Sequence, residues 1–179
     1  MLFRSDDGFD GVYLDIIDAW EYWSDEDNGE GFCLEPGVAA ARMINLVKVI
    51  AEYARTTCGK TDFLIFPQNG EPILEYDTGL EENVENDFLN VISGIGIEDL
   101  FYNETDLIDA ETTSFRTAFL DIIAGEGKKV IVVDYVDDGS ESETNLARIA
   151  SFRTKVTDAG YLPYAALTDR ALDLINPQD

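Results

Sequence analysis

Residues 8–23 read Gly8-Phe-Asp-Gly-Val-Tyr-Leu-Asp15-Ile-Ile-Asp18-Ala-Trp20-Glu-Tyr-Trp23. The apolar run over residues 11–17 is typical of a strand buried in a parallel sheet, and two carboxylates, Asp15 and Asp18, stand at its end. Three large aromatic residues follow directly: Trp20, Tyr22 and Trp23. Because the functional groups of parallel α/β folds gather at the carboxyl ends of their strands, we expect a site at this point of the chain.

Histidine is absent from all 179 residues. Its absence excludes Ser-His-Asp and Cys-His catalysis and most zinc sites, so proton transfer would fall to Asp, Glu, Tyr or Lys. Residues 24–35 have the spacing of a calcium loop, but Ser24 and Glu26 stand where that loop needs other ligands. We therefore expect no metal and no cofactor.

The charge balance is strongly acidic, with 37 Asp and Glu against 12 Lys and Arg and a net charge of −25. Such a field repels phosphate backbones and anionic lipid, so we expect neither nucleic acid nor a membrane as a partner. The acids are spread over the whole chain, which favours adaptation to high salt, a halophilic surface, over the alternative of an acidic groove for a cationic substrate.

The length and the 45% hydrophobic content predict one domain over residues 1–179. No stretch approaches the roughly 20 apolar residues of a membrane span, and the N-terminal residues lack the apolar region of a signal peptide. Cys33 and Cys58 flank a helical pattern that would hold them about 30 Å apart, so free thiols are expected.

Strand-like runs alternate with amphipathic segments, which predicts an α/β fold with a parallel sheet. The expected strands span residues 11–17, 62–66, 94–98, 130–135 and 162–166. The expected helices span residues 36–57, 80–89, 114–124 and 143–159. Between them, residues 19–35 and 99–113 form loops rich in acids and aromatics, the position of functional loops in an α/β barrel.

Acids recur at three of the expected strand ends: Asp15 and Asp18, Glu98 and Asp99, and Asp134 with Asp137 and Asp138. Gly94 and Gly96 share a strand face with Glu98 and leave room for its carboxylate. In a small barrel, strands two apart could bring Asp15 and Glu98 within the roughly 5–10 Å that separates the carboxyl pairs of glycosidases. The alternative for any one acid is a helix cap or a loop hydrogen bond.

Aromatic and amide side chains near these strand ends are candidates for sugar binding. Tyr13 shares a strand face with Asp15, and the rings of Trp20, Tyr22 and Trp23 could stack on the apolar face of a sugar. Packing of the same loop against the following helix is an equal alternative for each ring. Gln68 and Asn69 offer amides to sugar hydroxyls, although a plain turn also explains Asn69-Gly70.

Four motifs together resemble glycoside hydrolase family 114, the endo-α-1,4-polygalactosaminidase family. They are the segment from Gly8 to Ala19, Phe66-Pro-Gln-Asn-Gly70, Gly94-Ile-Gly-Ile-Glu98-Asp-Leu-Phe-Tyr102 and Val132-Val-Asp134-Tyr-Val136, in family order. The resemblance implies a TIM (β/α)8 barrel that hydrolyses galactosamine polysaccharide, with Asp15 as nucleophile and Glu98 as acid/base. Further sugar contacts would come from Asp18, Asp99, Tyr102, Asp134, Tyr135 and Asp137.

The expected architecture is a partial barrel of about five βα units, because an eight-unit barrel typically needs about 250 residues. Against the family pattern, the first three strands are missing, so the strands at 11–17 and 162–166 would have open edges. Those edges predict self-association or pairing with an N-terminal half. The favoured function is retaining hydrolysis of an amino-sugar polysaccharide. The alternatives are inverting hydrolysis, an inactive fragment or carbohydrate-binding module that needs a partner chain, and, least favoured, a metal-dependent enzyme.

Overall fold

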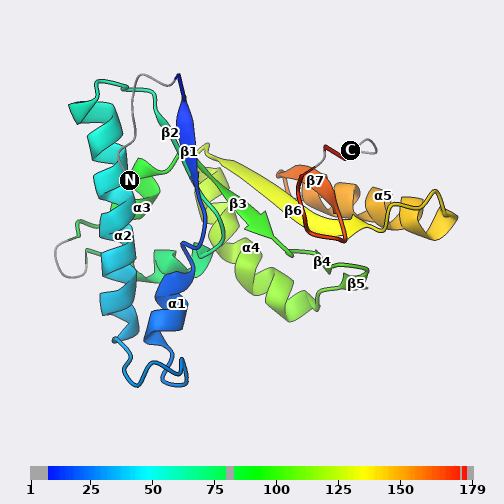
Figure 1. Cartoon of the computed structure of the whole chain (residues 1–179), viewed down its shortest axis with the longest axis horizontal. Helices are drawn as coiled ribbons and strands as arrows, with labels where there is room; N and C mark the ends of the chain where they lie inside the picture. Colours follow the sequence, from blue (N-terminus) through cyan, green and yellow to red (C-terminus); the bar gives the residue numbers. More distant parts are fainter. Residues whose placement is uncertain (1–7, 80–82, 174, 177–179) are drawn as a thin grey trace. The chain divides into compact units, whose positions relative to one another are not determined.

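Parallel pairing of strands that are separated along the chain by helices is the common feature of the structure (Figure 1). The computed structural model describes residues 8–79, 83–173 and 175–176. Two compact units divide the chain between Gly94 and Ile95. Each unit is described by itself below, and the expectation of one domain over residues 1–179 stays a prediction.

In the first unit, β1 (Gly11–Leu14) pairs in parallel with β2 (Leu64–Pro67). Gly11 lies opposite Leu64, and a Cβ atom built at position 11 would lie 2.6 Å from the Leu64 Cβ. The strand ends three residues before the expected end because Ile16 adopts a φ of 61°, which takes the backbone out of the extended conformation.

The helices of the first unit are α1 (Ala19–Ser24), α2 (Pro36–Glu52), the 3-10 helix η3 (Glu71–Tyr76) and α3 (Asp87–Val91). A π-helical turn, η2 (Tyr53–Thr57), continues α2, so the helical segment has the extent that the sequence predicts. Pro36 occupies the first turn, where its missing N–H costs nothing. The expected helix at 80–89 falls partly on residues 80–82, which lie outside the described residues, and α3 begins only at Asp87.

The second unit holds a three-stranded sheet in the order β3 (Gly94–Glu98), β6 (Lys129–Asp137) and β7 (Leu162–Leu167), and β6 pairs with β7 in parallel. A short antiparallel hairpin of β4 (Tyr102–Asn103) and β5 (Asp106–Leu107) follows β3. Two helices, α4 (Ala110–Gly125) and α5 (Glu143–Asp158), complete the unit. In Figure 1, α5 (orange) lies along β6 and β7.

Apolar side chains of the sheet and of both helices form the core of the second unit. The fully buried members include Ile95, Ile97, Val132, Leu120, Ile123 and Phe152. The pairing of β6 with β7 is regular up to Asp134 and shifts by one residue before Asp137, which is a β-bulge at Tyr135 and Val136. Bulges re-aim side chains, and this one lies where β6 approaches the end of β3.

These features confirm the predicted α/β class with parallel strands, of the kind found in a partial TIM-like barrel. Among the described residues the strands form separate sheets and no closed barrel. Both cysteines are free thiols, as predicted, and Cys33 is exposed. In the described part of the chain, no helix has the length and apolar character that crossing a bilayer requires.

Candidate active site

The turn after β3 carries Glu98, the predicted acid/base, and side chains from several elements fix its backbone. Asp99 adopts a φ of 50°, a left-handed conformation that is uncommon outside glycine. Arg116 of α4 donates through Nη1 to the carbonyl oxygens of Glu98 and Asp99, at 2.9 and 3.0 Å. Because both carbonyls are held by one guanidinium, the strained turn is fixed where Glu98 leaves the strand.

Asp134 of β6 holds the same turn from the other end. Its side chain is fully buried, and its two carboxylate oxygens accept hydrogen bonds from the backbone N–H groups of Leu100, Phe101 and Tyr102, at 2.9, 2.9 and 2.8 Å. Burial raises the pKa of Asp134 to about 6, although the three N–H donors favour the carboxylate. The structure therefore places Asp134 under the loop as a backbone acceptor, with no exposed surface for a sugar.

Tyr135, the next residue, reaches Glu98 itself. Its phenol O–H donates to Oε1 of Glu98. Burial, and then the hydrogen bond to Glu98, raise the pKa of Tyr135 above its ordinary value, so the phenol stays a donor at neutral pH. Arg170, which follows β7, lies over the phenol ring with Cζ 3.9 Å from the ring centre. The same guanidinium forms an ion pair with Asp99, with Nη2 2.7 Å from Oδ2.

Two further residues that the sequence assigned to sugar contacts lie inside the second unit. Asp137 is 1% exposed and accepts hydrogen bonds from the side-chain amides of Asn145 and Asn176, at 2.7 and 2.9 Å. Tyr102 is buried, and its hydroxyl donates to Ser151 of α5 at 3.0 Å. Asp137 thus accepts structural hydrogen bonds, which was the alternative given above for each acid. Tyr102 likewise bonds to a neighbouring element of the unit.

In the first unit, the ends of β1 and β2 bring the other candidates side by side. The N–H of Gln68 donates to the carbonyl of Leu14 at 2.8 Å, so Gln68 continues the pairing next to Asp15. Asp15 is exposed, and its Oδ1 accepts the N–H of Ile16 at 2.8 Å. Gly70 touches the backbone of Asp18, where an added Cβ would lie 3.0 Å from the Asp18 nitrogen.

Tyr13 and Asp18 complete this group at the strand ends. Tyr13 is 51% exposed, on the same face of β1 as Asp15 by the alternation of a strand. Asp18 stands at the N-cap position of α1, but its side chain makes no capping hydrogen bond. Capping, the main alternative for an acid at a strand end, therefore does not account for Asp18.

Three candidate residues share one backbone feature: each is followed by a non-glycine residue with positive φ. The pairs are Asp15 with Ile16 (φ 61°), Gln68 with Asn69 (φ 56°) and Glu98 with Asp99 (φ 50°). A β-branched residue such as Ile16 is a rare exception in this region. Conformations of this cost cluster at functional sites, so each of the three strand ends is by itself a candidate for a functional position.

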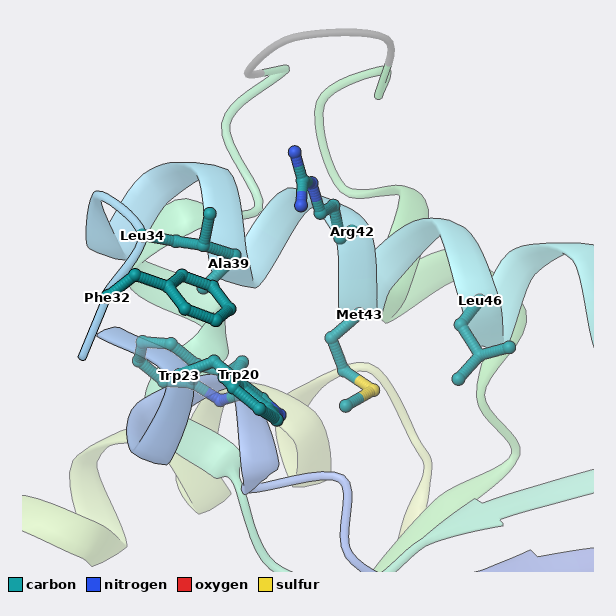
Figure 2. A pocket seen from close by; sticks show the side chains of 8 residues that line it. All are labelled: Trp20, Trp23, Phe32, Leu34, Ala39, Arg42, Met43 and Leu46. Atoms are coloured by element: carbon teal, nitrogen blue, oxygen red, sulfur yellow. The ribbon is translucent and has the colours of Figure 1, made fainter. Parts of the chain in front are cut away.

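The aromatic loop packs against α2 and frames an apolar pocket (Figure 2). Trp20 is 6% exposed and meets Tyr76 edge to face, with ring centres 5.4 Å apart. Trp23 stacks on Phe32 with ring centres 5.6 Å apart. Figure 2 shows the rings of Trp20, Trp23 and Phe32 at one end of the pocket and Met43 of α2 beyond them. Trp20 is thus buried by packing, which was the alternative given for each ring of this loop. Trp23 stays partly exposed.

The pocket has a volume of about 360 Å³ and lies wholly within the first unit. Its lining is Trp20, Trp23, Phe32, Leu34, Ala39, Arg42, Met43 and Leu46. Tyr22 turns to the loop, where its hydroxyl donates to the carbonyl of Asn28 at 2.8 Å. In the part of the chain that the structure describes, no group of three acidic or cysteine side chains is arranged to hold a metal ion. The expectation of no metal and no cofactor stays a prediction.

Parallel α/β units with acids and amides at the carboxyl ends of their strands are typical of α/β enzymes, and glycosidases with paired carboxylates are one class of them. Within that class, the chain belongs to glycoside-hydrolase family GH114, whose model matches residues 4–177. The resemblance found in the four motifs is thereby confirmed over nearly the whole chain.

Two curated relatives support the assignment. An uncharacterized protein of Methanocaldococcus jannaschii is 41% identical over 169 residues, which are 94% of this chain and 45% of the relative. An uncharacterized protein of Thermotoga maritima is 42% identical over 171 residues, which are 96% of this chain and 49% of the relative. The chain thus spans about half the length of the curated relatives it matches.

Proposed function

We propose that this chain carries the acid/base and nucleophile of a glycoside hydrolase that cleaves α-1,4-galactosaminide linkages in an amino-sugar polysaccharide. The observation that carries the proposal is the turn after β3. There Glu98 is half-buried and accepts a hydrogen bond from the phenol O–H of Tyr135. The backbone of the turn is fixed by Arg116 and Asp134. Membership of a glycoside-hydrolase family supports a sugar as the substrate.

The proposed mechanism is retaining hydrolysis in two steps. Asp15 attacks the anomeric carbon while Glu98 gives its proton to the leaving glycosidic oxygen, so that a covalent glycosyl ester forms on Asp15. Glu98, now a carboxylate, takes a proton from water, which attacks the anomeric carbon and releases Asp15. The hydrogen bond from Tyr135 to Oε1 holds the carboxyl group of Glu98 in place during both proton transfers.

Recognition of the amino sugar would fall to the ends of β1 and β2. Asp15 and Asp18 supply negative charge there, and Gln68 and Asn69 supply amides. A cationic amino group suits a chain of net charge −25. Trp23 is 37% exposed, and its ring could stack on the apolar face of a neighbouring sugar.

The test is hydrolysis of a defined α-1,4-galactosamine oligosaccharide, followed by chromatography of the products. Asp15→Asn and Glu98→Gln should each lower kcat by at least about 1,000-fold, the scale of a lost catalytic carboxylate. Asp158→Asn removes an exposed acid at the end of α5 and is the matched control, with the parental rate. Parental rates in both site variants would contradict the assignment of the two carboxylates.

The stereochemistry is decided by proton NMR of the first product formed. A retained anomeric configuration supports Asp15 as nucleophile, and an inverted one replaces that role with general base catalysis on water. Binding of the oligosaccharide without any cleavage would contradict the hydrolase and favour the carbohydrate-binding alternative.

A further inference from the structure

The proposed mechanism does not use Arg170, although the side chain of Arg170 contacts the turn that carries Glu98. Arg170 lies in the segment after β7 and adopts a φ of 59°, a conformation that costs free energy for a residue with a side chain. Its side chain is 38% exposed, yet the guanidinium makes a stacking contact and an ion pair at once. Both partners, Tyr135 and Asp99, are adjacent to Glu98 by contact or by sequence.

The ion pair fixes the guanidinium plane. Nη2 lies 2.7 Å from Oδ2 of Asp99 and Nη1 lies 3.3 Å from Oδ1, so the two groups meet in the two-point geometry that arginine forms with carboxylates. Asp99 itself is held by its backbone, since its N–H donates to the carbonyl of Val133 and its own carbonyl accepts from Arg116. Arg170 is therefore anchored to a part of the turn that cannot swing freely.

The stacking contact fixes the phenol. With Cζ of Arg170 3.9 Å from the ring centre, the guanidinium covers one face of Tyr135. The ring already lies at the bulge of β6, where its direction is set by the backbone. Its hydroxyl then donates to Oε1 of Glu98. The chain of contacts runs from Asp99 through Arg170 and Tyr135 to Glu98.

We propose that Arg170 is a positioning residue, which acts through Tyr135 to hold the carboxyl group of Glu98 in one rotamer. The role rests on the proposed function, in which Glu98 transfers a proton to and from a reacting atom at a fixed position. Arg170 does not touch the reacting atoms in this role. Its loss should lower the rate of proton transfer and leave substrate binding almost unchanged.

The first arm of the test is kinetic. Arg170→Met keeps the length of the side chain and removes the planar cation, and we expect kcat to fall about 10-fold to 100-fold with KM within about twofold of the parent. Arg170→Lys keeps the charge and loses the two-point fork, so it should recover part of the rate. Lys155→Met, an exposed cation on α5, is the charge-matched control and should keep the parental rate.

The second arm does not need activity. Tyrosine labelled with carbon-13 at Cζ gives one NMR signal per residue, and Tyr135→Phe identifies the signal of Tyr135. We expect Glu98→Gln and Arg170→Met each to move this signal, because each removes a partner of the phenol, and Lys155→Met to leave it in place. The kinetic and spectroscopic arms together separate this proposal from the hydrolase itself.

Each outcome decides one of the two ideas. A Tyr135 signal that does not move in Arg170→Met would overturn the positioning role, whatever the rate. A signal that moves while kcat stays parental would overturn it too, because the contact would then have no catalytic consequence. An inactive parent with a signal that depends on both Arg170 and Glu98 would support the positioning of Glu98 and contradict the proposed hydrolase.

Discussion

The two proposed catalytic carboxylates, Asp15 and Glu98, stand at the turns after β1 and β3. The structure holds these two turns by different means. At the end of β3, Glu98 stands on a turn fixed by side chains of α4, β6 and the segment after β7. At the end of β1, Asp15 is exposed and bonds to the N–H of the next residue, and the turn is held by close backbone contact with Gly70.

The difference follows from what each group is proposed to do. A proton donor needs one oxygen aimed at the leaving group, so a fixed side chain is useful at Glu98. A nucleophile needs an accessible oxygen, and Asp15 has solvent on its carboxylate. We therefore expect the Glu98 turn to depend on side-chain charge and the Asp15 turn to depend on backbone shape.

The largest effect should come from the buried carboxylate of Asp134, which accepts three backbone hydrogen bonds from the loop that follows Glu98. Its folded-state pKa of about 6 lies above the ordinary 3.8, so the folded protein binds this proton more tightly than the unfolded chain. The resulting stability is complete only below about pH 3, well under the unfolded pKa, and is lost as the pH rises through 6. Its size is about 3 kcal/mol, from about 1.4 kcal/mol per pKa unit.

Urea unfolding of the parent and of Asp134→Asn at several pH values measures this contribution. The parent's advantage over the variant should shrink by about 3 kcal/mol between pH 3 and pH 7. Thr154→Ala on α5 removes no titratable group, and its difference from the parent should stay constant. A constant difference for Asp134→Asn as well would show that this proton is not linked to folding.

A somewhat smaller effect is expected at Arg116, which tests the dependence on charge directly. Arg116→Met removes two charged hydrogen bonds to carbonyl oxygens of the Glu98 turn, and we expect a loss of about 2 kcal/mol in the free energy of unfolding. Arg42→Met, an exposed arginine of α2, should cost less than about 0.5 kcal/mol. Equal costs in urea unfolding would remove the contrast between the two turns.

Backbone shape at the β1 turn is tested at Gly70. Gly70→Ala adds a Cβ 3.0 Å from the Asp18 nitrogen to a residue with φ of 73°, and should cost about 2 kcal/mol. Gly127→Ala is matched in φ, at 74°, but has nothing within 4 Å of the added atom, so it should cost about 1 kcal/mol. Thermal unfolding of the two variants separates contact from conformational strain. If Gly127→Ala costs as much stability as Gly70→Ala, the contact of the added atom with Asp18 does not account for the loss at position 70.

Salt should have the smallest effect and should act on both turns alike. The net charge of −25 repels itself in dilute buffer, where the Debye length is about 30 Å at 0.01 M and about 3 Å at 1 M salt. The melting temperature should therefore rise by several degrees over that range, by equal amounts in the parent and in Asp15→Asn. A flat profile would contradict adaptation to salt and favour acids gathered for binding.

The elements with local signals were predicted best from the sequence. The bounds of β3 are as predicted, and those of α5 differ by one residue, because glycines and caps mark their ends. The start of α4 was placed four residues late, although Asp109 caps it by accepting the N–H of Thr112. The 3-10 helix η3 was not predicted, since a single turn has no periodic pattern.

The site could be predicted only in part. The strand-end acids were visible in the sequence, but the direction of each side chain was not, because the register shift that begins after Asp134 and includes Tyr135 has no signal in the periodicity. Arg170 and Arg116 were missed altogether. Arg170 is 71 residues from Asp99 in sequence and belongs to no motif, so only the folded unit brings them together.

The close approach of Gly11 to Leu64 bears on how the first unit folds. If β1 slid by one residue along β2, Asp10 or Val12 would face Leu64, where the gap between the backbones admits no side chain. A slip would also turn every side chain of the strand to the opposite face, Asp15 included. Gly11 thus fixes the register of β1 on β2, and this register decides which face of the sheet the side chains of β1 point to.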